Sequence, residues 1–132
     1  MSFLKKSELV NVVVNEIIYV APEDWATIVY YAERLRDEVI GIRNMNVSKC
    51  WLGKGMIPYD NSKGPPLKVS VELFDAVDEL FEYSEKSGDA WSGLLLKIDD
   101  TGKYINKFYY EGTPLLDGDD NELNRRMDEF TE

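Results

Sequence analysis

The chain has 132 residues, of which 44% are hydrophobic and 12% aromatic, enough for one core in a single domain spanning residues 1–132. Its 15 basic and 25 acidic residues give a net charge of −10, and no apolar run approaches a membrane span in length. The absence of histidine and the single cysteine exclude imidazole catalysis, His/Cys zinc sites and an internal disulfide. We expect Cys50 to be a buried small hydrophobe in a protein of the reducing cytoplasm.

The first half of the chain predicts one helix followed by strands. Apolar residues recur at helical spacing over 9–20, and Pro22-Glu23-Asp24 predicts a turn after them. Runs of β-branched and aromatic residues then predict strands within 25–35, 39–45 and 47–52, with a turn at 36–38. The segment 53–66 is rich in Gly and Pro, which indicates a loop. The residues expected to face the core from the first helix are Leu9, Val12, Val13, Ile17 and Val20.

The clearest helix is predicted from Ser70 to Lys86, with Ser70 as its N-cap. One face is apolar and is expected to face the core. It carries Leu73, Phe74, Val77, Leu80, Phe81 and Ser84. The opposite face is acidic, with neighbouring carboxylates three or four residues apart. These are Glu72, Asp75, Glu79 and Glu82.

The second half continues with a β-hairpin and a short helix. Strands are predicted over 91–98 and 103–110, joined by the turn Asp99-Asp100-Thr101-Gly102. An acidic loop follows at 117–120, and a helix is predicted over 121–130. The order of elements indicates an α+β domain. An antiparallel sheet of about five strands is expected to pack with the N-terminal, central and C-terminal helices.

The negative charge is concentrated in one half of the sequence. Residues 1–66 have no net charge, whereas residues 67–132 carry the entire −10. Such a field repels phosphate backbones, which argues against direct nucleic-acid binding, and it attracts a basic protein surface. We therefore predict a protein partner rather than a nucleic acid or a membrane.

Two motifs suggest chemistry but have simpler explanations. Asp100-Thr101-Gly102 matches the tripeptide of aspartic proteases, but Lys103 follows where a small residue is needed, and a hairpin turn explains the motif. Asp117, Asp119, Asn121 and Asp128 have the spacing of a calcium loop, but Glu122 occupies its glycine position. We predict no catalytic residue, no metal and no cofactor.

Trp25 and Trp91 are expected at the core or a strand edge. Trp51 precedes the Gly/Pro-rich loop that contains Tyr59, and an aromatic residue in that position can anchor a partner. We keep Trp51 and Tyr59 as candidate partner-binding residues beside the core interpretation.

Two blocks of the sequence resemble the YezG-like immunity proteins. The first runs from Pro22-Glu23-Asp24-Trp25 through Ile28-Val29-Tyr30-Tyr31-Ala32-Glu33. The second runs from Ala90-Trp91-Ser92-Gly93 through the Thr101-Gly102-Lys103-Tyr104 turn to Phe108-Tyr109-Tyr110-Glu111. Members of that family are bacterial antitoxins that neutralise a cognate polymorphic toxin, often a nuclease. The resemblance implies a binding protein without catalysis.

These observations lead to one hypothesis and two alternatives. The acidic helix face (Glu72, Asp75, Glu79 and Glu82) and the acidic loop (Asp117, Asp119 and Asp120) are expected to lie near each other. Together they would cover the basic surface of a toxin, and a homodimer is compatible with the sequence. An adaptor for another basic partner, or a hydrolase using paired carboxylates and a metal, would account for the same acidic residues.

Overall fold

The computed structural model of the protein describes residues 3–21, 25–52 and 67–129. In these ranges, four strands form one antiparallel sheet in the order β2-β1-β3-β4, accompanied by four helices. The elements are α1 (Phe3–Val20), β1 (Trp25–Asp37), β2 (Gly41–Leu52), α2 (Val71–Lys86), β3 (Gly93–Asp99), β4 (Tyr104–Tyr109), α3 (Pro114–Asp117) and α4 (Asp120–Met127).

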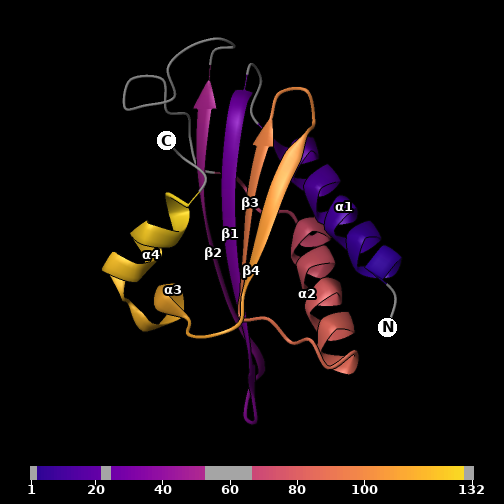
Figure 1. Cartoon of the computed structure of the whole chain (residues 1–132), viewed down its shortest axis with the longest axis vertical. Coiled ribbons are helices and arrows are strands. Elements are labelled where there is room, and N and C mark those ends of the chain that lie inside the picture. The colour runs from indigo at the N-terminus through magenta and orange to yellow at the C-terminus, as the bar shows by residue number, and fades with distance from the viewer. Residues whose placement is uncertain (1–2, 22–24, 53–66, 130–132) are drawn as a thin grey trace.

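Helices cover both faces of the sheet. α1 and α2 pack on one face, whereas α3 and α4 lie on the other (Figure 1). β1 is therefore buried continuously from Ile28 to Arg34 instead of alternating between buried and exposed residues. Successive side chains of a strand point to opposite faces, so β1 contributes to two separate cores.

The larger core lies between the sheet and the pair α1 and α2. Val13 and Ile17 of α1 and Leu80 of α2 are fully buried there. Phe81 meets Trp91 edge to face, with ring centroids 5.4 Å apart. The predicted burial of Trp91 and Cys50 is confirmed, and Trp25 packs against the same core.

The smaller core lies under α3 and α4. Val29, Tyr31 and Leu95 of the sheet meet Tyr109 and Met127 there, and Leu115 and Leu123 pack against them. The short helices thus bury only a few apolar side chains, and polar contacts hold much of this side of the molecule together.

The α+β class and most of the predicted elements are confirmed. Ser70 caps α2, and its side chain accepts a hydrogen bond from the Leu73 N–H at 3.0 Å. The hairpin turn at 99–102 is present, and Gly102 adopts φ 87°, a value that favours glycine. The acidic loop predicted at 117–120 is shorter, because α3, which begins at Pro114, includes Asp117 and α4 begins at Asp120.

Several expectations about the first half of the chain are wrong. The strands predicted at 39–45 and 47–52 are one strand, β2, because its pairing with β1 runs from Asp37↔Gly41 to Thr27↔Trp51. The sheet therefore has four strands in the described residues rather than five, and the turn lies at 38–40. α1 begins at Phe3 rather than residue 9, and Val12 is 44% exposed. The predicted turn at 22–24 and loop at 53–66 lie outside the described residues.

β1 and β2 extend beyond the rest of the sheet as a two-stranded arm. β3 pairs with β1 only over 27–33, so residues 35–44 continue without a third strand beside them (Figure 1). The arm ends in a turn where the Asp37 carboxylate accepts hydrogen bonds from the N–H groups of Val39 and Ile40. Val39 is 90% exposed, which leaves an apolar tip.

Candidate functional site

The four carboxylates predicted on the central helix form a continuous acidic surface, which we call the acidic α2 face. Six of the sixteen residues of α2 are acidic and one is basic. Asp78 and Glu85 of this set turn towards β1, where they bind Arg34 and Arg36. The remaining four are exposed: Glu72, Asp75, Glu79 and Glu82.

The three loop carboxylates do not join the acidic α2 face. α2 and the α3–α4 segment cover opposite faces of the sheet, so the expectation that the two groups lie near each other is wrong (Figure 1). Asp117 accepts a hydrogen bond from the Thr113 hydroxyl at 3.1 Å, and Asp119 caps α4 through the Glu122 N–H. Asp120 lies exposed in the first turn of α4.

The aromatic candidates are placed only in part. Trp51 lies in β2, where its backbone pairs with Thr27. Tyr59 lies outside the described residues. Their role as partner-binding residues therefore stays a prediction.

A buried carboxylate connects β1 to the start of α3. Glu33 is fully buried, and its carboxylate accepts hydrogen bonds from the Tyr31 hydroxyl at 2.6 Å and from the N–H groups of Leu115 and Leu116 at 2.9 and 2.8 Å. The first N–H groups of a helix have no partner within the helix, so Glu33 caps α3 from another element. Burial, and then the bond to Glu33, raise the pKa of Tyr31.

Arg126 of α4 completes this buried network. Its guanidinium donates to the Tyr31 hydroxyl at 2.8 Å, to Glu122 at 2.8 Å and to the Glu111 carbonyl at 2.7 Å. It also stacks over the Tyr109 ring at 4.2 Å. The hydrogen bonds from Arg125 and Arg126 lower the pKa of Glu122 to about 2. The network ties α3 and α4 to the sheet, so we assign it a structural role.

This network was not predicted from the sequence. The sequence feature that could have indicated it is the pair Glu33-Arg34. These two charged residues directly follow the apolar run 28–32 of the same strand. A charge in a strand buried on both faces needs a partner, because its desolvation is otherwise costly. Arg34 supports this reading, since its side chain is buried on the opposite face and binds Asp78 at 2.7 Å.

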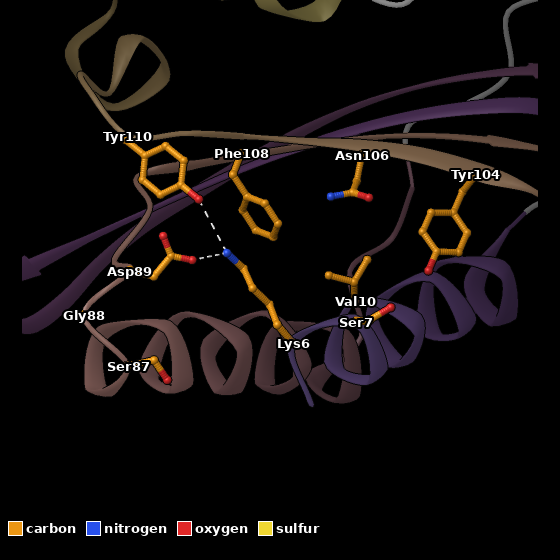
Figure 2. A pocket seen from close by; sticks show the side chains of 10 residues that line it. All are labelled: Lys6, Ser7, Val10, Ser87, Gly88, Asp89, Tyr104, Asn106, Phe108 and Tyr110. Atoms are coloured by element: carbon orange, nitrogen blue, oxygen red, sulfur yellow. Dashed lines mark hydrogen bonds and ion pairs between the residues drawn. The ribbon is translucent and has the colours of Figure 1, made fainter. Parts of the chain in front are cut away.

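A groove of about 650 Å³ lies between α1 and β4, and we call it the α1–β4 groove (Figure 2). Side chains from α1, from β4 and from the segment after α2 line it. They are Lys6, Ser7, Val10, Ser87, Gly88, Asp89, Tyr104, Asn106, Phe108 and Tyr110. Its walls thus combine aromatic rings with amide, hydroxyl and charged groups.

Lys6 contacts several side chains at one end of the groove. Its ammonium group forms an ion pair with Asp89 and lies 4.1 Å from the centre of the Phe108 ring (Figure 2). It also lies within 3.5 Å of the Tyr110 hydroxyl. The hydrogen bond from Lys6 lowers the pKa of Asp89. At the other end, the Tyr104 hydroxyl donates to Asn11 of α1.

Neither a metal-binding cluster nor a membrane-spanning helix is present among the described residues. No group of three or more His, Cys, Asp or Glu side chains there is arranged to hold a metal ion. None of the described helices combines the length and the apolar character required to cross a membrane.

Comparison with known proteins agrees with the resemblance predicted from the sequence. The chain is 27% identical over 116 residues to Immunity protein YezG of Bacillus spizizenii, an alignment that covers 81% of this chain and 70% of that protein. No protein-family model matches. Both blocks that suggested the resemblance contribute to the central sheet, as β1 and as the β3–β4 hairpin. The chain is thus similar to Immunity protein YezG over most of its length.

Proposed function

We propose that the protein is an immunity protein that binds and neutralises a cognate bacterial toxin through the acidic α2 face. The observation that carries this proposal is the similarity to Immunity protein YezG, combined with four exposed carboxylates on one rigid helix. α2 is anchored by buried residues along its whole inner face, so these carboxylates keep fixed relative positions.

Electrostatics favours a nuclease as the toxin. An enzyme that acts on a polyanionic substrate presents cationic residues to it, and a matching acidic surface can cover them. We infer that the encounter takes place in the cytoplasm, where such a toxin would meet nucleic acid. The protein needs no catalytic group of its own to inhibit in this way.

The direct test pairs the protein with the toxin encoded by the neighbouring gene. We expect the two purified proteins to form a complex, and the complex to lose the nuclease activity of the toxin alone. If the neighbouring gene encodes a toxin without nuclease activity and the protein still neutralises it, the immunity role stands and the nuclease assignment is wrong. Failure to bind or protect would overturn the proposal.

Charge reversal tests the docking face. The variant Asp75→Lys/Glu79→Lys should bind at least about tenfold more weakly, because it replaces attraction by repulsion at the centre of the acidic α2 face. The matched control is Glu111→Lys/Asp120→Lys, which makes the same charge change at exposed positions outside α2. If the control weakens binding and the α2 variant does not, the docking face is on the α3–α4 side.

A further inference from the structure

We propose that the outer edge of β4 and the α1–β4 groove receive an extended segment of the toxin, which adds to the sheet as a further strand. This inference rests on the proposed function and specifies a second contact, away from the acidic α2 face. Two observations support it. The outer edge of β4 is open in the described part of the chain, and side chains of β4 line the adjacent groove.

Among the described residues, no strand pairs with the backbone groups on the outer side of β4. In the described part of the chain it is the last strand of the sheet, bonded only to β3. The Asp99 N–H donates to the Lys103 carbonyl, and bonded pairs alternate along an antiparallel ladder. Residues 103, 105 and 107 therefore face β3, while the N–H and C=O groups of Tyr104, Asn106 and Phe108 point to the open edge.

The groove lies where the side chains of an added strand would fall. Tyr104, Asn106 and Phe108 all line it, and Val10 of α1 forms part of the opposite wall (Figure 2). A segment bonded to the edge of β4 would place alternate side chains between that strand and α1. Backbone bonds with pockets for alternate side chains are the established mode of strand addition to an open sheet edge.

The charge of β4 favours a neutral or acidic segment as occupant. Residues 103–110 include Lys103 and Lys107 but no acidic residue, in a chain of net charge −10. Lys107 contacts Glu129 at 3.0 Å and is still 44% exposed. Two copies of this chain paired through β4 would bring the same lysines of both copies to one edge, where like charges repel. A neutral or acidic toxin segment would not be repelled by these lysines, so it fits the β4 edge better than a second copy does.

The first variant removes a hydrogen-bond donor at the open edge. Asn106→Pro deletes an N–H that does not face β3, and proline is tolerated on edge strands when its missing donor faces solvent. We expect toxin affinity to fall at least tenfold while the urea midpoint of the free protein stays close to that of wild type.

A second variant keeps the test valid if proline disturbs folding. Ser7→Trp fills the groove from α1 without changing β4, and we expect a similar loss of affinity. Glu8→Trp is the matched control, since Glu8 is exposed on α1 but does not line the groove. In the wild-type complex, the amides of residues 104, 106 and 108 should become protected from hydrogen exchange.

The outcomes separate the two proposals. Absence of binding by the wild-type protein refutes the proposed function itself. Wild-type binding that both Asn106→Pro and Ser7→Trp leave intact overturns the strand-addition proposal alone. A dimer of the free protein that Asn106→Pro dissociates, seen by sedimentation, would assign the β4 edge to a second copy and also overturn it.

Discussion

Glu33 shows at the scale of one residue how a buried charge is stabilised in this protein. Its carboxylate accepts three hydrogen bonds in a site without exposed surface. Replacing Glu33 by Ala leaves the N–H groups of Leu115 and Leu116 without that acceptor, so we expect a loss of about 2–4 kcal/mol in the free energy of unfolding. Urea denaturation measures this value. Glu38→Ala, at an exposed turn position, should cost less than about 0.5 kcal/mol.

Gly93 is needed because Tyr31 approaches its backbone. A Cβ atom at Gly93 would lie 2.7 Å from the Tyr31 hydroxyl oxygen and 3.3 Å from an Arg126 nitrogen. We expect Gly93→Ala to destabilise the protein by about 1–3 kcal/mol through overpacking. In the Tyr31→Phe background the same substitution should cost less, because its closest contact is gone. Equal costs in the two backgrounds, measured by urea denaturation, would contradict this explanation.

Glu122 is expected to make stability depend on acid pH. Its pKa is lowered to about 2 in the folded protein by hydrogen bonds from Arg125 and Arg126, whereas the ordinary value is 4.5. The folded state therefore gains stability above pH 4.5 and loses this gain as the pH falls towards 2. Glu122→Gln should unfold at lower urea than wild type at pH 7, and the difference should vanish near pH 2. A difference that does not depend on pH would show that packing, not charge, is responsible.

At the scale of the element, the cap of α2 should contribute measurably to stability. The Ser70 side chain accepts the Leu73 N–H, one of the donors that the helix cannot satisfy itself. We expect Ser70→Ala to cost about 1 kcal/mol, measured by thermal or urea denaturation. Ser7→Ala, at an exposed position of α1, should have almost no effect. A cost for Ser70→Ala as small as that of Ser7→Ala would mean that tertiary packing alone holds α2.

The elements also show which local signals were sufficient. The alternation of Leu73, Val77, Leu80 and Phe81 with acidic residues predicted α2 to within one residue, because this helix has one buried and one exposed face. β2 was predicted as two strands, with Asn46 between them. Pairing with β1 overrides this local preference, as strand propensity depends strongly on neighbours.

At the scale of the whole molecule, the uneven charge should appear in the kinetics of toxin binding. We expect the association rate to fall at least about tenfold between 20 and 500 mM NaCl, because salt screens attraction between exposed charges. The dissociation rate should change less. Stopped-flow fluorescence measures both, and an association rate independent of salt would refute electrostatic docking by the acidic α2 face.

The negative charge is concentrated in the second half of the sequence, but the helices distribute it over both faces of the sheet. α2 carries its carboxylates on one side of the sheet, while Asp117, Asp119 and Asp120 lie on the other. On that second side, Arg125 and Arg126 pair with Glu122 and offset part of the acidity. We therefore expect a basic partner to dock on the α2 side of the sheet, where the acidic surface is stronger.

The sequence alone determined the features that depend on local pattern: the α+β class, the amphipathic α2 with its cap, the hairpin with Gly102, and the resemblance to YezG-like proteins. These follow from periodicity, capping and turn chemistry, which act over a few residues. Only the tertiary structure decided that the two acidic groups are separated, that Glu33 and Arg126 are buried together, and that β4 leaves an open edge above a groove. Each of these depends on contacts between residues distant in the chain, and no local pattern encodes which faces of the sheet the helices cover.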